Sequence, residues 1–494
     1  MVDQPFILAL DVGTSSARAL LYDASGTAVP GVSAQQSYQL TTSQEGEASV
    51  DADSLVDLVV HTIDEVLQKA GARAAQIIAV ATSTFWHTLL PLNASGHPLM
   101  SLLTWEDTRP QHAATALRAR LDEAEIHRRT GVPLHASYWP AKISWLVDAH
   151  PEIVRQTARY VSFGEYLHTR LLGRAVCSLS MASGTGLLNM LVRAWDTRLL
   201  ELLHISPSQL APLGDLPNTL QGLKPEFAKR WPILKSVLWF PPLGDGAAAN
   251  IGSNCADVSA WAVTIGTSSA MRVVMPSSVQ ILPEKGLWLY YVDARRAIVG
   301  GALSEGGNVL AWLKNTLQLP DPDKLETQMA SLEPAAHGLT ILPQLAGERS
   351  PGWHAHASLT ISGLTLHSTP VEIARAALEA VACQLSQIYH QLAHMFSTQA
   401  TPPRLIASGG ALLSSPLLSQ ILADMLNRPI EFSRYNEASA RGAALLALEN
   451  LRLLPDLTQA TPETSSIVYP NPDRHKIYQR ACARQQVLYK QFFP

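Results

Sequence analysis

The first hundred residues alternate apolar runs with turn sequences, a pattern that predicts strands joined by tight turns. A continuous apolar run at residues 6–10 predicts a buried strand. A second strand is predicted at residues 18–22, before the turn sequence Asp-Ala-Ser-Gly, and a third follows it. Apolar residues at helical spacing then predict a helix between the acidic start at residues 51–53 and Gly71. The apolar run at residues 77–81 predicts a further strand.

The second half of the chain repeats this order of elements. Residues 261–265 and 404–408 each predict a strand. The sequence Thr-Pro-Val-Glu at residues 369–372 combines a capping box with a proline at the first helical position, so a helix is predicted to begin there. Another helix is predicted over residues 415–427. Because strands and helices alternate, the pattern indicates an α/β fold.

The pentapeptide Gly-Thr-Ser-Ser-Ala occurs twice, at residues 13–17 and 266–270, each time directly after a predicted strand. These small residues are common, so coincidence is one interpretation. The other is a duplicated domain, with both copies facing one cleft. The chain has 494 residues, and hydrophobic cores usually stop growing at about 250–300 residues. We therefore expect two lobes, residues 1–254 and 255–494, with the cleft between them.

Composition and charge exclude several other classes of protein. Hydrophobic residues make up 47% of the chain and charged residues 16%, which argues against a disordered chain. The formal net charge of −4 gives no basic field for nucleic acid. The four cysteines lie far apart without a zinc or disulfide pattern, and no apolar stretch is unbroken enough to span a membrane. We expect a cytoplasmic protein; a homodimer is compatible with a sequence that is silent on oligomeric state.

The first pentapeptide has the residues that phosphoryl transfer requires. The reaction needs backbone N–H groups and a cation around the phosphates, a bound Mg²⁺, and a base for the attacking hydroxyl. Gly13, Thr14 and Ser15 offer close backbone approach and hydroxyl donors. Asp11 stands at the strand end, where a carboxylate can hold Mg²⁺ through water, and Arg18 can reach a phosphate. The alternative is a plain hairpin turn beside a surface arginine.

Asp245, between Gly244 and Gly246, is the candidate general base. An aspartate between two glycines before a helix is often only a turn or a cap. Asp245, however, lies about twenty residues before the second pentapeptide, where the cleft is expected. That position favours a catalytic interpretation.

The ordered set of motifs resembles the FGGY carbohydrate kinases, within the wider sugar kinase, actin and heat-shock chaperone fold. The matching segments follow the family's order along nearly the whole chain: residues 11–16, 105–109, 244–246, 264–268, 306–308, 347–351, 408–410 and 441–444. The resemblance implies two duplicated lobes of the actin-like, ribonuclease H-like type, with ATP and Mg²⁺ in the cleft between them.

The resemblance also implies a role for each matching position. Asp245 would accept the proton of the substrate hydroxyl, Asp11 would lie near Mg²⁺, and Thr14 and Arg18 would contact the transferred phosphate. The remaining residues expected to line the ATP site are Gly13, Ser15, Gly266, Thr267, Gly307, Ala311, Gly410 and Ser414. Relatives often carry an amide side chain at Ala311 or Ser414, so fewer polar contacts are expected at these two positions.

Within the family, the closest resemblance is to gluconate kinases, and it implies the residues of the sugar site. Trp86, His87 and Asp107, together with Asp245, would bind the substrate. His87 and Trp86 have the alternative of being plain core, and Lys142 is expected either to pair with a site carboxylate or to cap a helix. Glu305 departs from the asparagine common in gluconate kinases, and it would repel a substrate carboxylate nearby.

These observations predict an ATP-dependent kinase that phosphorylates a small sugar acid, most specifically gluconate. A kinase for another sugar or polyol, such as a pentulose or a deoxyketose, is the nearest alternative. A non-catalytic sensor of nucleotide or sugar on the same fold is the alternative from another class, although Asp11, Arg18 and Asp245 argue against it. The carbon that is phosphorylated does not follow from the sequence.

Overall fold

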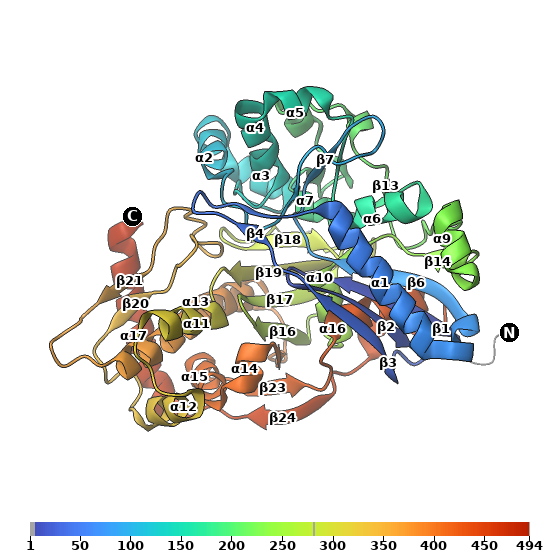
Figure 1. The fold of residues 1–494 in the computed structure, drawn as a ribbon. Coiled ribbons are helices and arrows are strands. Elements are labelled where there is room, and N and C mark those ends of the chain that lie inside the picture. Colours follow the sequence, from blue (N-terminus) through green and yellow to red (C-terminus); the bar gives the residue numbers. More distant parts are fainter. Residues whose placement is uncertain (1–4, 280–281, 494) are drawn as a thin grey trace.

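A computed structural model describes residues 5–279 and 282–493, which fold into two lobes, each built around a mixed β-sheet (Figure 1). The first sheet has the order β14-β6-β1-β2-β3, with β15 also paired to β6. Its strands are β1 (Phe6–Val12), β2 (Ser16–Tyr22), β3 (Ala28–Ser37), β6 (Ile77–Thr84), β14 (Leu238–Trp239) and β15 (Leu243–Gly244).

The second sheet has the order β18-β19-β17-β16-β22-β23-β24. Its strands are β16 (Ala260–Ile265), β17 (Ser269–Pro276), β18 (Trp288–Tyr291), β19 (Arg296–Leu303), β22 (Arg404–Ser408), β23 (Ile430–Ser433) and β24 (Thr464–Val468). Five small sheets contain the remaining short strands: β4 (Thr41–Thr42), β5 (Ala48–Val50), β7 (Leu90–Leu92), β8 (Leu102–Leu103), β9 (Arg159–Val161), β10 (Cys177–Ser178), β11 (Leu188–Asn189), β12 (Ala194–Trp195), β13 (Leu213–Gly214), β20 (Thr340–Leu342) and β21 (Thr360–Ser362).

The centres of the two sheets are built in the same way. β1 pairs antiparallel with β2 and parallel with β6, and β16 pairs antiparallel with β17 and parallel with β22. Each copy of the pentapeptide forms the turn between the two antiparallel strands. The predicted duplication of an α/β lobe is therefore confirmed.

The helices begin and end largely where the local sequence predicts. α1 (Ala52–Ala70) starts at the capping residue Asp51, whose side chain accepts the Ser54 N–H, and Gly71 ends it with a positive φ of 56°. α13 (Pro370–Met395) has the predicted capping box of Thr369 and Glu372. α15 (Pro416–Leu426) ends at Asn427 in the left-handed conformation.

The remaining α-helices cover the sheets and extend both lobes. α2 to α5 form a helical layer at the top of Figure 1, and α17 packs against α13 and α15 in the second lobe. Their bounds are α2 (Gln111–Arg120), α3 (Glu123–Thr130), α4 (Trp139–Ala149), α5 (Pro151–Gln156), α6 (Phe163–Leu172), α7 (Leu179–Thr185), α8 (Thr197–Leu202), α9 (Pro225–Arg230), α10 (Asp245–Gly252), α11 (Gly307–Thr316), α12 (Pro322–Ser331), α14 (Gly410–Ser414), α16 (Ala438–Asn450) and α17 (Pro472–Phe492). In the described ranges, none of the helices combines the length and apolar character that a bilayer crossing requires.

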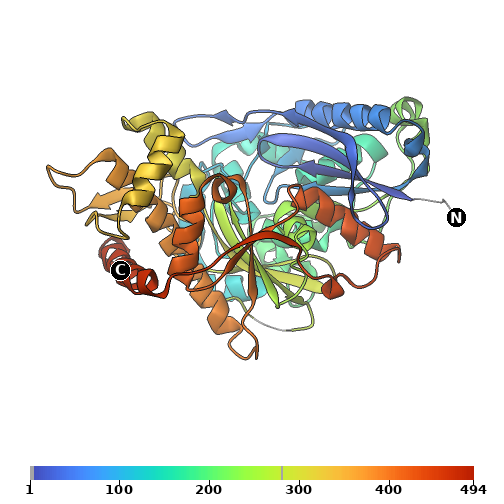
Figure 2. The same ribbon diagram turned by 90° about the horizontal axis from the view of Figure 1, so that it is seen from below.

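α10 and α16 cross between the two sheets and join the lobes (Figure 1). Their backbones touch at two glycines: a Cβ on Gly252 would lie 1.8 Å from the Ala438 carbonyl oxygen, and one on Gly442 would lie 1.8 Å from that of Ala248. α16 also packs on β1 and β6, so a helix from the second half of the sequence covers the first sheet (Figure 2). This crossing fixes the first residue of α10, Asp245, between the lobes.

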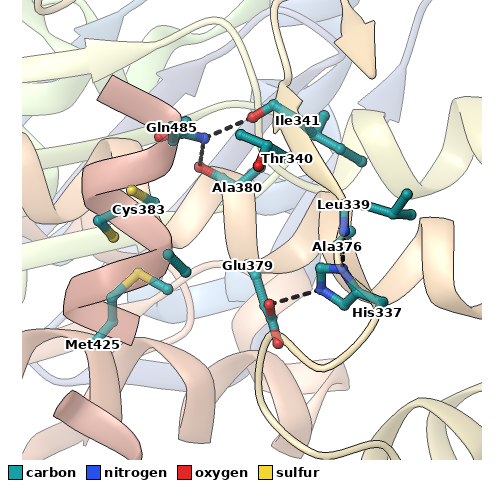
Figure 3. A pocket seen from close by; sticks show the side chains of 12 residues that line it. His337, Leu339, Thr340, Ile341, Ala376, Glu379, Ala380, Cys383, Met425 and Gln485 are labelled. Carbon is teal, nitrogen blue, oxygen red and sulfur yellow. Dashed lines mark hydrogen bonds and ion pairs between the residues drawn. The ribbon is translucent and has the colours of Figure 1, made fainter. Parts of the chain in front are cut away.

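A small pocket of about 30 Å³ lies in the second lobe beside α13 and α17 (Figure 3). A network of buried polar groups surrounds it. Glu379 accepts from Arg375 at 2.7 Å, from the His337 Nε2 at 3.0 Å and from the Tyr478 hydroxyl at 3.2 Å. Because the Leu339 N–H donates to the His337 Nδ1, the Nε2 carries the proton that Glu379 accepts. The network connects α13 with α17 and lies apart from the interlobe cleft.

Candidate active site

Three cavities adjoin along the cleft between the lobes, and Asp245 lines two of them. An acidic cavity of about 260 Å³ is lined by Asp11, Arg18 and Glu437. An aromatic cavity of about 150 Å³ is lined by several aromatic rings, Trp86 among them. Asp245, Gly246 and Arg272 line both, so these residues form the boundary between the two cavities. An outer cavity of about 440 Å³ adjoins the aromatic cavity at Trp105 and Arg349.

Asp11 and Arg18 face each other across the first hairpin. They are direct partners in the register of β1 and β2. The Arg18 Nη1 lies 3.6 Å from the Asp11 Oδ2 and 3.2 Å from the Glu437 Oε2. Burial and, to a smaller extent, the nearby Asp245 raise the pKa of Asp11 to about 7 although Arg18 lowers it. The acidic cavity thus brings three carboxylates, Asp11, Asp245 and Glu437, close to two guanidinium groups.

The residues of the acidic cavity fit a magnesium ion. The Oδ1 of Asp11 is buried and has no hydrogen-bond partner among the described residues. Within the described part of the chain no cluster of three metal-ligating side chains forms, as expected for Mg²⁺, which commonly takes one or two carboxylates and completes its shell with water and phosphate oxygens. Asp11 would hold such an ion, which would neutralise charge on the phosphates of a nucleotide.

The turn at Gly13–Ser15 is fixed by two aromatic side chains. The Tyr38 hydroxyl donates to the Gly13 carbonyl at 2.5 Å, and the Trp105 Nε1 donates to the Thr14 hydroxyl at 3.0 Å. Thr14 lines the aromatic cavity, whereas Ser15 is exposed. The structure therefore places this turn between the acidic and aromatic cavities.

The second turn contacts the start of α11. The Gly307 N–H donates to the Gly266 carbonyl at 2.7 Å, and the Asn308 N–H donates to the Thr267 carbonyl at 3.2 Å. A Cβ on Gly307 would lie 3.1 Å from that of Ala411 at the start of α14, so the space between these elements is narrow. Gly266, Thr267 and Gly307 thus form one cluster in the second lobe.

The three other residues predicted for the ATP site lie on α11 and α14. Ala311 follows Gly307 by one helical turn and is exposed. Gly410 begins α14 after Gly409, whose φ of 99° and close approach to the Ile265 carbonyl require a glycine. Ser414 ends α14, is exposed, and donates to the Ala411 carbonyl at 3.4 Å. Their contact with nucleotide stays a prediction.

His87 is held in a strained backbone conformation inside the aromatic cavity. Its φ is 67°, which is uncommon for a residue with a side chain. Burial holds the pKa of His87 well below the usual 6.5, and Arg349 lowers it further, so the ring is neutral. Its Nδ1 donates to the Gly184 carbonyl at 2.6 Å, which leaves the Nε2 as a hydrogen-bond acceptor.

Trp86 explains why Asp245 stands between two glycines. The Trp86 Nε1 donates to the Ser180 carbonyl at 3.0 Å, which fixes the indole. A Cβ on Gly244 would lie 1.8 Å from the Trp86 ring, and one on Gly246 would lie 2.7 Å from it. The indole therefore packs directly on the backbone that carries Asp245.

Asp245 has the environment of a general base. Its Oδ1 accepts the Gly246 N–H at 2.8 Å. Burial raises the pKa of Asp245 above the usual 3.8, while Arg272 and the two backbone N–H groups oppose that rise. A carboxylate with a raised pKa accepts a proton more readily near neutral pH.

Asp107 and Glu305 lie outside the aromatic cavity. Asp107 lines the outer cavity, and its oxygens accept from the Ala48 N–H and from Arg109, with the Arg109 Nη2 at 2.5 Å. Glu305 is 1% exposed, and its Oε1 accepts the Leu345 N–H at 3.2 Å. Burial raises the pKa of Glu305 to about 8, so its carboxyl group is largely protonated at neutral pH. Its contact with the Leu345 N–H turns the side chain away from the aromatic cavity.

Lys142 supports the strained His87 backbone, which corrects the two roles expected from the sequence. Its Nζ donates to the carbonyls of His87 at 2.5 Å and Thr104 at 2.7 Å, and it neither pairs with a site carboxylate nor caps a helix. No local pattern indicates this contact, because His87 and Lys142 are brought together only by the packing of α4.

We expect Lys142 to make stability depend on pH. Burial lowers the pKa of Lys142 from the usual 10.5 to about 7, against a raising effect of Asp107. Between these two pKa values, the unfolded chain therefore binds more protons than the folded protein. The free-energy cost of burying Lys142 is largest below pH 7 and decreases as the pH rises towards 10.5. Between pH 7 and 9, wild-type protein should gain up to about 1.4 kcal/mol per pH unit relative to Lys142→Met. Urea unfolding of both proteins at pH 7 and at pH 9 measures this gain. Substitution of the exposed Lys229 is the control, and it should change the free energy of unfolding by the same amount at both pH values.

Arg272 and Arg349 line the aromatic cavity although the sequence assigned neither a role in the site. A signal was present for both. Arg272 follows the second pentapeptide closely, much as Arg18 follows the first, and Arg349 lies in the segment 347–351 that matches the family motif. Trp288 and Tyr290 also line the cavity, from β18, and no motif marked them.

Comparisons with known proteins identify the family of the chain. Models of the FGGY family of carbohydrate kinases match the chain twice, the N-terminal domain at residues 6–252 and the C-terminal domain at residues 261–450. A gluconokinase from Bacillus licheniformis is 28% identical over 90% of this chain and 87% of its own length. A glycerol kinase from Rhodospirillum centenum is 29% identical over 93% of this chain and 92% of its own.

Solved structures give the same result for the whole chain. The gluconate kinase and the xylulose kinase from Lactobacillus acidophilus each superpose with a TM-score of 0.89 and 28% identity, covering 99% of this chain and 98% of their own. The similar proteins thus share one fold but are named as kinases of different acceptors.

Proposed function

The chain belongs to the FGGY family of carbohydrate kinases, which transfer a phosphoryl group to an alcohol, and from this premise we propose that its acceptor is a small sugar acid, gluconate. Membership implies the use of ATP. The proposal of gluconate is supported by the motifs around His87 and Arg349 and by the similarity to gluconate kinases over most of the chain.

The observation that carries the proposal is the position of Asp245 on the boundary of two cavities. On one side, Asp11 and Arg18 provide a carboxylate and a guanidinium suited to a phosphate chain with its metal ion. On the other side, rings and polar groups form a cavity suited to a polyhydroxy chain. A base at the boundary can contact the hydroxyl that attacks the phosphate.

In the reaction proposed for this site, the substrate hydroxyl oxygen forms a bond to the γ-phosphorus of ATP. The bond between that phosphorus and the bridging oxygen breaks, and ADP leaves. Asp245 accepts the proton of the hydroxyl. The Nε2 of His87 accepts a hydrogen bond from another substrate hydroxyl and orients the chain. Arg18 stabilises charge on the transferred group.

ATP would lie across the two hairpin turns. Gly13, Thr14 and Arg18 would contact its phosphates from the first lobe, and Gly266, Thr267 and Gly307 from the second. Ala311, Gly410 and Ser414 would line the adenosine part. Because the two turns belong to different lobes, closure of the cleft would bring the phosphates to Asp245 and exclude water.

A coupled assay of ADP release, with ATP and Mg²⁺, tests the proposed substrate. Gluconate, xylulose, a deoxyketose and glycerol are offered separately, and the expected result is the highest kcat/KM with gluconate. The site of phosphorylation follows from the ³¹P NMR spectrum of the product. Absence of turnover with gluconate would refute the proposed acceptor, and a response to xylulose alone would identify a pentulose kinase instead.

A further inference from the structure

The aromatic cavity carries one more positive than negative side chain. Its ionisable lining consists of Asp245, Arg272, Arg349 and the neutral His87. Both arginines lower the pKa of Asp245, Arg272 more than Arg349, so the two cations share one carboxylate. Arg349 is then the cation without a matching anion in the cavity. Leaving such a charge in a partly closed cavity is costly unless a ligand neutralises it.

Arg349 is positioned to face a ligand. Its guanidinium lies over the Trp105 ring, 5.0 Å from the centroid. Within residues 5–279 and 282–493, no carboxylate oxygen lies within the 4.0 Å that defines an ion pair with it, and its buried Nε has no hydrogen-bond partner. Glu106 is the acid nearest in sequence to Trp105; the charge of Arg349 lowers its pKa while burial raises it.

The positive charge of Arg349 also acts on two neighbouring histidines. The pKa of His87 and that of His135 are both lowered by burial first and by Arg349 second. His87 is therefore kept neutral by its burial first and by the charge of Arg349 second. Trp105, whose ring lies under Arg349, donates a hydrogen bond to the Thr14 hydroxyl. This contact connects Arg349 to the first pentapeptide turn, beside the proposed phosphate site.

Resting on the proposed function, we infer that Arg349 binds the carboxylate of the substrate and so selects sugar acids over neutral polyols. Arg349 and Asp245 line the same cavity, so a substrate whose reacting hydroxyl contacts Asp245 can place its anionic end at the guanidinium. A planar guanidinium matches a carboxylate in bidentate geometry. Arg272 stays with Asp245 and keeps the base charged. Arg349 is thus a specificity-determining residue.

The test compares gluconate with glucitol, which has a neutral CH₂OH group in place of the carboxylate. Wild-type enzyme should prefer gluconate, and Arg349→Gln should lower kcat/KM for gluconate by about 10- to 100-fold, the effect of losing a charge-assisted hydrogen bond. The value for glucitol should change by less than about threefold. Arg349→Lys retains the charge without the planar fork and should give an intermediate preference.

Arg118→Gln is the matched control, because it removes a guanidinium that contacts the same loop. The Arg118 Nη1 donates to the Trp353 carbonyl at 3.0 Å, and Arg118 lines a different groove. Its variant should keep the preference for gluconate. An equal loss on both substrates in Arg349→Gln, or a wild-type enzyme indifferent to the carboxylate, would overturn the inference.

A binding measurement separates this inference from the proposed reaction. Trp86, Trp105 and Trp288 line the cavity, so gluconate binding should change tryptophan fluorescence. If no acceptor is phosphorylated, the proposed reaction fails. The anion site is still supported if gluconate changes the fluorescence of the wild-type protein but not of Arg349→Gln, and if glucitol causes no change. No titration with gluconate in the wild-type protein overturns it.

Discussion

Replacement of Asp245 by asparagine should lower kcat by about 10²- to 10⁴-fold, the usual contribution of a positioned general base. Asparagine keeps the shape of the side chain and can still accept the Gly246 N–H, but it cannot take up a proton. The contact of Trp86 with Gly244 and Gly246 does not involve the carboxylate, so the cavity should keep its form. Steady-state kinetics with the best acceptor measure the effect.

Binding experiments provide the control for Asp245→Asn. ATP and the acceptor should bind the variant with affinities near those of the wild-type protein, since Arg18 and His87 are unchanged. The thermal unfolding midpoint should also stay close to the wild-type value. A kcat within tenfold of wild type would remove Asp245 from the role of base.

Replacement of Glu379 by alanine should destabilise the protein by about 3–5 kcal/mol, the range for breaking a buried ion pair by removing one partner. Arg375 and Glu379, both on α13, are 3% and 5% exposed. Both side chains form hydrogen bonds with the Tyr478 hydroxyl on α17. Without the carboxylate, the guanidinium of Arg375 stays buried and uncompensated, and the proton of His337 loses its acceptor. Urea unfolding at neutral pH measures the loss.

Glu372→Ala is the matched control on the same helix. Glu372 belongs to the exposed capping box at the start of α13, so its loss should cost about 1 kcal/mol or less. If both variants lose the same small amount, the buried network around Glu379 is not a stabilising element. The folded fraction of Glu379→Ala should retain its kcat, because the network lies outside the cavities that Asp245 lines.

Local sequence was sufficient for the elements that depend on their own residues. The strands around both pentapeptides and the starts of α1, α13 and α15 lie where turn and capping sequences predict. These features are short-range, since a capping side chain bonds to a backbone group three residues away. The repeated pentapeptide predicted two lobes, because two equivalent strand-turn-strand units need two sheets.

The site was predicted only in part, for reasons visible at particular residues. Asp245 and His87 lie together in the aromatic cavity, as the motifs led us to expect, although their catalytic and binding roles stay proposals. Asp107, placed in the same site from the sequence, lies in the outer cavity, bound to Arg109. Its place depends on which way a loop turns, which no local pattern encodes.

The sequence by itself determined the fold class, the duplication and the positions of the two pentapeptide turns, because each depends on residues close together along the chain. Only the tertiary structure decided which charges share a cavity. Lys142 under His87, Glu305 turned away from the cavity, and Arg349 without an anion all depend on contacts between segments far apart in sequence. The proposed choice of acceptor rests on that long-range arrangement of charge, whereas the proposed binding of phosphate rests on the local turns.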